Sequence, residues 1–279
     1  MSDNPTYIHG YSFTEQARLI EQAEILAPAV FGGLALASDR TLLEIGCGVG
    51  AETRHLLRRW PQLEIDAIDL SEEQLVAARD YLCQDIAEKR VRVTRMNAED
   101  LRFADHRFDV AMTIWVLEHA PDPKKILREV SRVLRPGGRI ILNEVNNDTF
   151  RFYPHNPVIQ DWWDGFNAFQ QSCGADPFIG RRLEGLVEEV GYTDIRGEPL
   201  YAVSSLREPQ RRPELLRYSR DLMLSGAHNM KQAGYVDEAL EQKLRAEFQR
   251  LESRTDVDFE YVAVRLTARS THGESQPSH

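Results

Sequence analysis

The feature that most constrains the fold is a short apolar segment that runs directly into a turn with three glycines. Residues 41–45 read as a buried strand, and Gly46, Gly48 and Gly50 follow it at alternate positions. A helix is predicted from about residue 51 to residue 60. This order of strand, glycine turn and helix places free helix amides beside a backbone that a ligand can approach closely. The pattern predicts a ligand site at the carboxyl end of the strand.

Strand and helix patterns alternate through the first half of the chain. Further short apolar strands are predicted at 63–68, 91–96, 108–115 and 139–145. Amphipathic helices are predicted between them. Ser71 caps one continuous helix that reaches Ile86, and Asp122 caps another. A further helix at 12–27 precedes the first strand. Strands separated by helices indicate a parallel sheet that is covered on both faces.

The alternation stops after residue 146. Residues 147–178 are rich in aromatic side chains, 191–203 contain a sixth strand, and 206–252 read as mostly helical. Residues 258–268 alternate between apolar and polar positions, which is typical of a strand. The second half therefore differs in architecture from the first.

Composition narrows the classes of partner and compartment. The chain has 279 residues and a formal net charge of −10, so it repels the phosphate backbone, and nucleic acid is not expected as a partner. No apolar run is long enough to span a bilayer, and the amino terminus lacks the pattern of a signal peptide. The three cysteines are odd in number and far apart, which indicates a reduced, cytoplasmic protein. The histidines show no metal-binding spacing, so no metal is expected.

Two acidic residues sharpen the prediction of a ligand site. Glu44 lies two residues before Gly46, and Asp69 ends the second strand. A carboxylate at the position of Asp69 can accept hydrogen bonds from both ribose hydroxyls of a bound nucleoside. An acid at a strand end is costly to bury unless it is paired or binds a ligand. The pair favours a ligand that contains a nucleoside over two acids that only cap the following loops.

Two kinds of nucleoside ligand fit the loop. Gly46, Gly48 and Ala51 satisfy the G-x-G-x-x-A pattern of dinucleotide-binding proteins, in which a pyrophosphate sits on the helix start. Glu44 in the approach to the loop would repel a pyrophosphate and favours a ligand that carries positive charge. A nicotinamide- or flavin-dependent oxidoreductase stays open as the alternative.

Five segments in order resemble the motifs of class I, Rossmann-like S-adenosylmethionine-dependent methyltransferases of the small-molecule branch. Residues 44–50 fit the pattern E/D-x-G-x-G-x-G, and Asp69 fits the acid that closes the second strand. The other matching segments are 97–101, 108–119 and 134–139. The resemblance covers about residues 41–146 and leaves out the aromatic segment and the helical segment of the second half.

The resemblance implies an α/β fold with a seven-stranded, mainly parallel sheet, helices on both faces and a reversed last strand. It implies an amino-terminal lid helix in 1–40 and a cofactor-binding core in 41–146. An aromatic insertion, the sixth strand and a helical cap for the substrate would follow in 147–256. The last strand would occupy 257–268, and a disordered tail is expected in 269–279.

The cofactor implied is S-adenosyl-L-methionine, with S-adenosyl-L-homocysteine as its product. The residues expected to bind it are Glu44, Gly46, Cys47, Gly48, Gly50, Asp69, Leu70, Asn97, Ala98, Glu99 and Trp115. His119 is a candidate general base because an imidazole titrates near neutral pH, with positioning of the cofactor loop as the alternative. Tyr11 is expected to border the methyl-transfer site, with anchoring of its helix as the alternative.

The aromatic insertion is the predicted acceptor pocket, because it follows a strand whose carboxyl end lies on the ligand side. The residues expected to contact the acceptor are Tyr11, Phe152, Trp162, Trp163 and Phe166. A secondary core or a dimer interface would also explain so many aromatic side chains in one segment.

The predicted function is methyl transfer to an oxygen, nitrogen or carbon nucleophile of a small molecule, by a monomer or a homodimer, without a membrane or nucleic acid partner. An oxidoreductase and a catalytically inactive S-adenosylmethionine-binding regulator are the alternatives.

Overall fold

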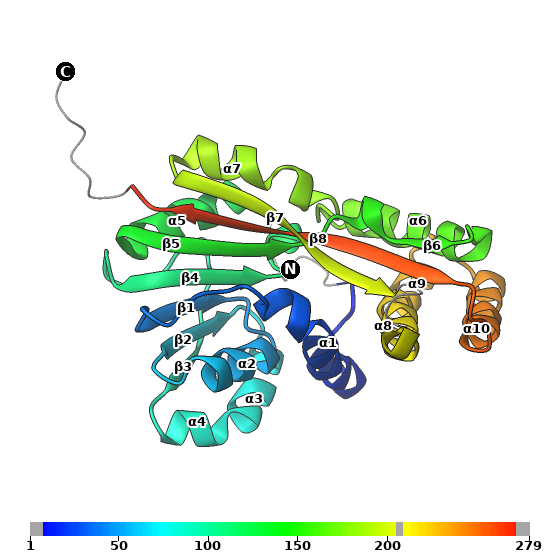
Figure 1. Ribbon diagram of the computed structural model, residues 1–279, viewed down its shortest axis with the longest axis horizontal. Coiled ribbons are helices and arrows are strands. Elements are labelled where there is room, and N and C mark those ends of the chain that lie inside the picture. The colour runs from blue at the N-terminus through cyan, green and yellow to red at the C-terminus, as the bar shows by residue number, and fades with distance from the viewer. Residues whose placement is uncertain (1–7, 205–208, 272–279) are drawn as a thin grey trace.

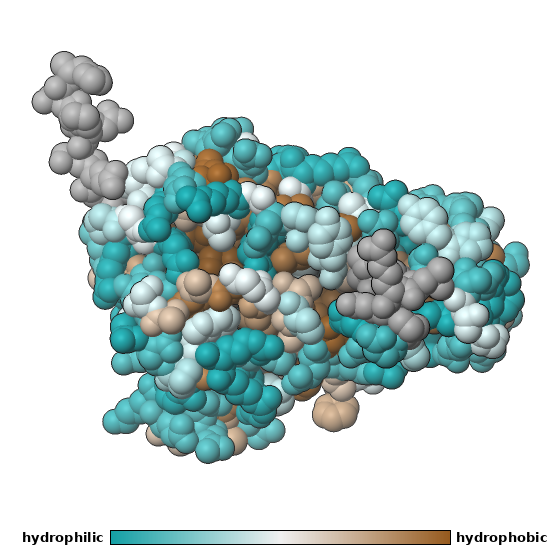
Figure 2. All heavy atoms as spheres, viewed as in Figure 1, coloured by the Kyte–Doolittle hydropathy of each residue, from teal (hydrophilic) through white to brown (hydrophobic). Residues whose placement is uncertain are grey.

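The computed structural model of the chain describes residues 8–204 and 209–271, and a single eight-stranded sheet runs through them (Figure 1). The strands lie in the order β3-β2-β1-β4-β5-β8-β6, and β7 pairs with β8 beside this path. The face of the molecule in Figure 2 is mostly hydrophilic, and hydrophobic residues show mainly in its recesses. Among the described residues, no helix is long and apolar enough to cross a membrane.

Five parallel strands form the first half of the sheet, as predicted. Their bounds are β1 Thr41–Ile45, β2 Glu64–Asp69, β3 Val91–Arg95, β4 Phe108–Ile114 and β5 Leu134–Glu144. β5 begins earlier than predicted, because Leu134 pairs with Phe108 ahead of a register shift. The carboxyl ends of β1, β2 and β4 share one edge of the sheet, and this edge carries the candidate site.

The helices between these strands are α2 Ala51–Arg59, α3 Glu72–Tyr81, α4 Cys83–Ala87 and α5 Pro123–Val133, and the turn after β4 contains the 3-10 helix η1 Leu117–His119. The Ser71 side chain caps α3 by accepting the Gln74 amide, as predicted. One continuous helix was expected over α3 and α4, but the chain breaks at Leu82. This buried side chain packs against the glycine loop at Gly50, which explains its place at the break.

The last strand is reversed, as predicted. β8 (Asp258–Arg269) runs antiparallel to β5, to β7 (Thr193–Ser204) and to β6 (Arg151–Tyr153). Its carboxyl-terminal half lies between β5 and β7, and its amino-terminal end pairs with β6. β6 is an additional strand that the sequence pattern did not reveal, since three residues are too few to show a period. The tail was expected to begin at residue 269, but β8 extends to Arg269 and Ser270 is buried. Residues 272–279 lie outside the described part.

The second half contributes helices α6, α8, α9 and α10 at the β6 end of the sheet, whereas α7 lies beside α5 and β7 (Figure 1). Their bounds are α6 Pro157–Ser172, α7 Leu183–Val190, α8 Arg212–Ser225, α9 Ala227–Gln232 and α10 Glu238–Glu252, with 3-10 helices at η2 Asn147–Thr149, η3 Ile179–Arg181 and η4 Pro209–Arg211. α6 packs against α8, α9 and α10. The helical character expected for 206–252 is confirmed for the described residues 209–252.

The amino-terminal helix α1 (Phe13–Phe31) runs past Pro28 and is longer than the predicted 12–27. Its carboxyl end is held by the buried Arg265 of β8. This guanidinium donates hydrogen bonds to the carbonyl oxygens of Ala29 (2.9 Å), Val30 (2.6 Å) and Gly32 (2.9 Å). Carbonyls at a helix end have no partner within the helix, so a cation there stabilises the final turn. The sheet therefore anchors α1 beside the ligand edge.

Candidate active site

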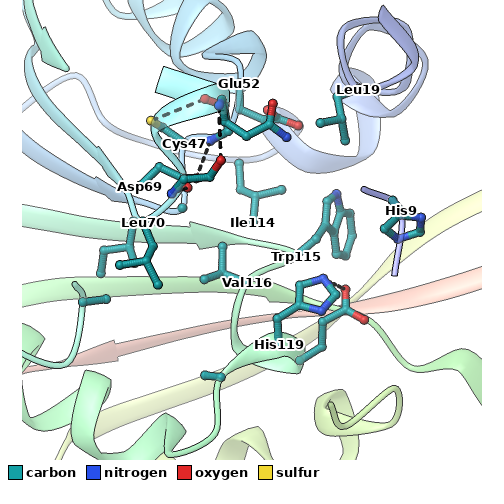
Figure 3. A pocket seen from close by; sticks show the side chains of 18 of the residues that line it. His9, Leu19, Cys47, Glu52, Asp69, Leu70, Ile114, Trp115, Val116 and His119 are labelled. Carbon is teal, nitrogen blue, oxygen red and sulfur yellow. Dashed lines mark hydrogen bonds and ion pairs between the residues drawn. The ribbon is translucent and has the colours of Figure 1, made fainter. Parts of the chain in front are cut away.

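A cavity of about 530 Å³ opens at the carboxyl ends of β1, β2 and β4 (Figure 3). We call its two parts the loop end and the cap end. The loop end is lined by the glycine loop and by the residues after β2 and β3, including Gly46, Cys47, Gly48, Asp69, Leu70, Asn97, Ala98 and Glu99. The cap end is lined by residues of the turn after β4 and of the second half, including Glu118, His119, Cys173, Ala175, Tyr218, Leu222 and Tyr261.

The glycine loop reaches the cavity through its first four residues, Gly46 to Val49. Gly46 has a φ of +70°, and a Cβ built on it would come within 2.5 Å of the Val116 side chain in the turn after β4. Glycine at this position therefore lets two strand ends approach each other. Gly50 was expected to contact the cofactor, but it does not line the cavity. It packs against the Leu82 side chain, which a Cβ built on Gly50 would approach to 2.6 Å.

Asp69 joins the two loops at this end of the cavity. Its Oδ2 accepts a hydrogen bond from the Gly48 amide at 2.9 Å, and its Oδ1 accepts one from the Ser71 amide at 2.8 Å. Burial raises the pKa of this carboxyl, and the backbone amides oppose the shift. A carboxylate has about four acceptor sites, so Asp69 can still accept from a ligand.

Glu44 does not line the cavity, although it was predicted as a ligand contact. It is buried in β1, where burial raises its pKa to about 8, and its Oε2 has no hydrogen-bond partner among the described residues. Glu52, which sequence reasoning missed, does line the cavity from the first turn of α2, and burial raises its pKa to about 7. Of these two acids, Glu52 and not Glu44 therefore borders the loop end.

The segments after β2 and β3 both line the loop end. Leu70, Asn97, Ala98 and Glu99 all border the cavity. The Asn97 side chain accepts the Glu99 amide at 2.9 Å, which shapes the turn. Such a wall of apolar side chains and short polar groups suits one face of a planar base.

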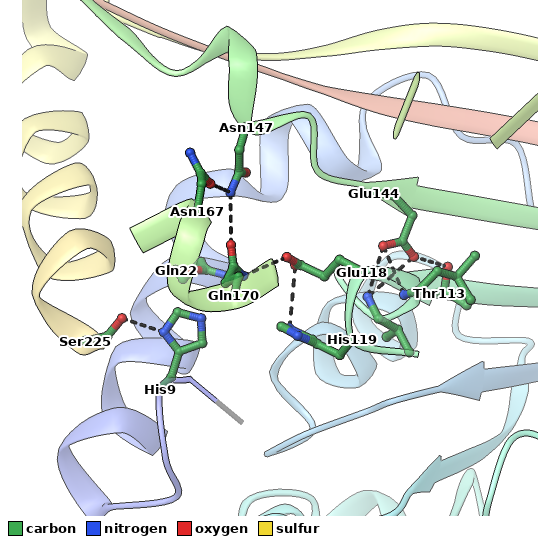
Figure 4. A network of polar contacts seen from close by, with 12 residues as sticks. His9, Gln22, Thr113, Glu118, His119, Glu144, Asn147, Asn167, Gln170 and Ser225 are labelled. Atoms are coloured by element: carbon green, nitrogen blue, oxygen red, sulfur yellow. Dashed lines mark hydrogen bonds and ion pairs between the residues drawn. The ribbon is translucent and has the colours of Figure 1, made fainter. Parts of the chain in front are cut away.

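The turn after β4 projects into the cavity because a buried acid holds its backbone. Trp115, which lines the cavity, has a φ of +57°, a left-handed conformation that costs energy in a bulky residue. Glu144 at the end of β5 accepts hydrogen bonds from the Thr113 hydroxyl (2.8 Å) and the Leu117 amide (3.1 Å) (Figure 4). The sequence contained no sign of this role, since Glu144 reads as the end of a strand.

His119 and its neighbour Glu118 face each other at the cap end. Nε2 of His119 lies 3.6 Å from Oε1 of Glu118 (Figure 4). Burial lowers the pKa of His119 to about 4 and raises the pKa of Glu118 to about 8. His119 is therefore neutral at pH 7 and a weak proton acceptor. Glu118 was not predicted as a site residue, although it adjoins one.

The amino-terminal segment closes one side of the cavity. His9, Tyr11 and Arg18 line it, and the place of Tyr11 beside the methyl-transfer site stays a prediction. Burial raises the pKa of Tyr11 and lowers that of His9. His9 Nδ1 lies 2.5 Å from the Ser225 hydroxyl of α8. Two segments far apart in sequence are thereby joined above the cavity.

Four of the five residues predicted to contact the acceptor lie elsewhere. Phe152, Trp162, Trp163 and Phe166 are absent from the cavity lining and are buried, and none exposes more than 5 % of its surface. Trp163 stacks on Phe166, with ring centroids 5.0 Å apart. On α6, Trp162 donates to the Met223 carbonyl of α8, and Trp163 packs against β8. Phe152 of β6 also packs against β8, so these rings belong to the core that joins the cap to the sheet. The expected acceptor contacts of these four are corrected accordingly.

The residues that replace them come from elements whose sequence showed no special pattern. Tyr218 and Leu222 lie on α8, Tyr261 on β8, and Cys173 follows α6. Arg18 and Gln22 approach from α1. Each looks like an ordinary helix or strand residue in sequence, and only the packing brings them together. Within 8–204 and 209–271, no group of three or more His, Cys, Asp or Glu residues is placed to hold a metal ion.

A family model described as a methyltransferase domain matches residues 43–142. The chain is 35 % identical over 136 residues to the 27-O-demethylrifamycin SV methyltransferase of Amycolatopsis mediterranei, covering 49 % of this chain and 50 % of that protein. It is 29 % identical over 199 residues to an O-methyltransferase of Penicillium expansum, covering 68 % of each. The chain spans about half the length of the first curated relatives that it matches.

Solved structures share the fold. Phosphoethanolamine N-methyltransferase 2 of Haemonchus contortus, in complex with S-adenosyl-L-methionine, superimposes with a TM-score of 0.58 at 17 % identity, covering 92 % of this chain and 57 % of that one. The (4+2)-cyclase SpnF superimposes with a TM-score of 0.56 at 19 % identity, covering 91 % and 82 %. At these identities the likeness concerns the fold alone.

The matched domain includes the glycine loop, Asp69 and the turn with Glu118 and His119. The sheet order and the reversed last strand extend the likeness beyond that domain. Residues 43–142 thus match a methyltransferase domain, and the chain has the Rossmann-like fold of solved S-adenosylmethionine-dependent methyltransferases.

Proposed function

We propose that this chain transfers a methyl group from S-adenosyl-L-methionine to an oxygen, nitrogen or carbon nucleophile of a small molecule. The observation that carries the proposal is the cavity at the ligand edge of the sheet, in which the glycine loop and Asp69 adjoin a second compartment bordered by the cap helices. One cavity can thus hold a nucleoside at the loop end and an acceptor at the cap end.

The charges at the loop end fit this cofactor better than a dinucleotide. S-Adenosylmethionine carries an ammonium, a sulfonium and a carboxylate but no phosphate. Glu52 and Asp69 line the loop end, and in the described chain Arg18 is the single Lys or Arg of the lining. A pyrophosphate on the start of α2 would meet Glu52 in the first turn, and like charges repel. The acids instead favour a ligand with positive groups.

Individual residues can be matched to parts of the cofactor. Asp69 would accept hydrogen bonds from the ribose hydroxyls, and Leu70, Asn97, Ala98 and Glu99 would border the base. Glu52 suits the ammonium and Arg18 suits the carboxylate, because each offers the opposite charge. Gly46, Cys47 and Gly48 would contact the ligand through their backbone, with Glu44 behind them in β1.

The bound cofactor supplies an activated methyl group on sulfur, so the protein mainly has to align the acceptor and exclude water. Holding two reactants in line can contribute about 7–11 kcal/mol. Trp115, His119 and Tyr11 all line this cavity. We propose that they orient the acceptor there, and that His119 acts as a neutral hydrogen-bonding group.

The same geometry supports separate roles for two parts of the chain. We propose that residues 41–146 bind the cofactor and that 147–256, together with the lid in 1–40, shape the acceptor compartment. The acceptor is a small molecule, and the working form is a monomer or a homodimer.

Differential scanning fluorimetry tests the proposal with S-adenosylhomocysteine and NAD as alternative ligands. A rise in melting temperature with S-adenosylhomocysteine alone supports it, because a ligand that binds only the folded state stabilises that state. A rise with NAD alone would support the oxidoreductase instead. Release of S-adenosylhomocysteine from S-adenosylmethionine in the presence of a metabolite panel then separates an enzyme from an inactive binding protein.

A further inference from the structure

At the cap end of the cavity, a buried carboxylate is held in place by a directed chain of hydrogen bonds. Glu118 lines the cavity yet is only 6 % exposed. Its Oε2 accepts a hydrogen bond from Nε2 of Gln170 at 3.2 Å, while its Oε1 lies 3.6 Å from Nε2 of His119 (Figure 4). One oxygen is thus engaged by α6, and the other is directed to the imidazole at the cavity wall.

The donors behind Gln170 all point the same way. The Tyr261 hydroxyl donates to Oδ1 of Asn147 at 2.7 Å, and Nδ2 of Asn147 donates to Oε1 of Gln170 at 3.2 Å. Gln170 in turn donates to Glu118. Such a chain polarises each successive bond and ends on an acceptor, so it stabilises Glu118 in the form that accepts hydrogen bonds.

The charges that face Glu118 come from several elements. On its own 3-10 helix lies His119, on β5 lies Glu144, after α6 lies Asp176, and Tyr218 of α8 and Tyr261 of β8 complete the surroundings. The cation that shares the cavity, Arg18, bonds with Glu15 (2.6 Å) and with Gln22 (2.7 Å). An anionic acceptor would therefore add a negative charge to a buried group of acids that includes Glu118, Glu144 and Asp176, and burying such a charge is costly.

In contrast to an anion, an acceptor group that carries a proton would bind favourably at this site. An ammonium would gain a charge-assisted hydrogen bond from Glu118, and the rings of Tyr218 and Tyr261 offer faces that attract cations. A neutral hydroxyl would donate to the same carboxylate. Both nucleophiles must lose a proton when they are methylated.

Building on the proposed function, we infer that the acceptor compartment takes a small molecule whose reacting nucleophile is a hydroxyl or an ammonium, and that Glu118 receives its proton. An ammonium first passes a proton to the ionised Glu118 carboxylate, which leaves an amine with a free electron pair, whereas a hydroxyl passes its proton to Glu118 as it attacks. The oxygen or nitrogen then forms its bond to the methyl carbon, and the methyl–sulfur bond breaks with its electron pair going to sulfur. Gln170 is a positioning residue that acts through Glu118.

The protonation states agree with this assignment. Burial raises the pKa of Glu118 to about 8, so at neutral pH the empty site holds a proton on Glu118 and none on His119, whose pKa burial lowers to about 4. An ammonium that binds beside Glu118 displaces this proton to solvent. A hydroxyl can bind beside the protonated carboxyl, but Glu118 receives the hydroxyl's proton only after its own proton has left to solvent.

The test uses three probes that share one ring and differ at the nucleophile: benzylamine, benzyl alcohol and benzoate. Each is titrated at pH 7 into the protein saturated with S-adenosylhomocysteine, and the His119 imidazole signals are followed by NMR. The variants are Glu118→Gln, Gln170→Ala and, as a matched control, Asn167→Ala. Asn167 belongs to the same network through Asn147 but has no hydrogen bond to Glu118.

In the unmodified protein, benzylamine and benzyl alcohol should shift the His119 signals and benzoate should not. Glu118→Gln should weaken benzylamine binding about tenfold or more, as expected for loss of a charged hydrogen-bond partner, and should affect benzyl alcohol less. Gln170→Ala should weaken benzylamine binding in the same direction, and Asn167→Ala should leave it unchanged. Calorimetry in two buffers should record proton release with benzylamine only.

The inference is overturned if benzoate binds as well as benzylamine, if no probe shifts His119, or if Glu118→Gln leaves benzylamine affinity intact. Failure of S-adenosylhomocysteine to bind the unmodified protein would instead refute the proposed function, so the two failures are separate. Retained S-adenosylhomocysteine affinity in each variant shows that it is folded.

Discussion

The Glu144 carboxylate accepts a hydrogen bond from the Leu117 amide at 3.1 Å and thereby ties the end of β5 to the turn that carries Glu118 and His119. Glu144 is fully buried and also accepts the Thr113 hydroxyl. A buried carboxylate that accepts several hydrogen bonds fixes the positions of the donor groups. A buried donor that loses this partner has no water molecule to replace it. The shape of the cap end therefore depends on a residue outside the cavity.

Glu144→Ala should lower the free energy of unfolding by about 1–3 kcal/mol for each buried donor left without a partner. Urea unfolding measures the loss. Thr113→Val removes a single donor of the same network, so it should lower the free energy of unfolding by less than Glu144→Ala does. Equal stability of Glu144→Ala and the unmodified protein would show that the turn does not depend on this carboxylate.

Asp69→Ala should weaken the binding of S-adenosylmethionine by about 1.5–3 kcal/mol, the value of a hydrogen bond to a charged group. Isothermal titration calorimetry measures the affinity. Asp122→Ala is a suitable control, since Asp122 caps α5 and lies outside the cavity lining. It should cost about 0.5–2 kcal/mol of stability with no change in affinity. An unchanged affinity in folded Asp69→Ala would rule out the ribose assignment.

Trp162→Ala, Trp163→Ala and Phe166→Ala should each destabilise the fold by about 3–5 kcal/mol, because these side chains lie in the core. The indole nitrogens of both tryptophans donate to carbonyl oxygens at 2.9 Å, so truncation also removes a hydrogen bond. Melting temperatures check the prediction, and Phe13→Ala, at a residue that is 85 % exposed, should leave them unchanged. If the variants change the kinetics with the acceptor but keep their stability, these residues would instead contact the acceptor.

The pH dependence of stability should change in Glu52→Gln. Burial raises the pKa of Glu52 from 4.5 to about 7, so the folded state holds this proton more tightly than the unfolded state. The resulting stabilisation is fully present below about pH 4.5 and is lost as the pH rises through about 7. Compared with the unmodified protein, Glu52→Gln should gain relative stability as the pH rises from about 4.5 to about 7, because these are the two pKa values.

Thermal unfolding of both proteins across this range measures the difference, and Glu72→Gln, at an exposed position on α3, provides the control. The same titration predicts that binding of S-adenosylmethionine near pH 7 releases protons, since a cationic ligand favours ionised Glu52. A stability difference that does not vary with pH would contradict the assignment of the raised pKa to this residue.

Much of the parallel half could be predicted from sequence because its signals are local. The strands β1 to β4 show as short apolar runs, Ser71 and Asp122 mark helix starts, and Gly46 needs its positive φ within a single turn. Asp69 ends a strand whose neighbours place it at the ligand edge. Each of these properties depends on a few consecutive residues and on the known geometry of parallel sheets.

The acceptor compartment could not be predicted in the same way. Aromatic side chains indicate that a segment is buried, but they do not say against which surface. α6 turns Trp162 and Trp163 toward the core, whereas Tyr218 and Tyr261, ordinary members of a helix and a strand, reach the cavity. The direction in which a helix presents its apolar face depends on its packing partners, and these are distant in sequence.

The sequence by itself determined the parallel α/β core, the glycine loop and the acid that closes β2, since periodicity and turn chemistry act over short segments. Only the tertiary structure decided that Glu44 lies behind the loop while Glu52 faces the cavity, and that Glu118 meets His119, Gln170 and two tyrosines at the cap end. The physical reason is that contacts between distant segments decide which polar groups are buried together, and burial sets their charge.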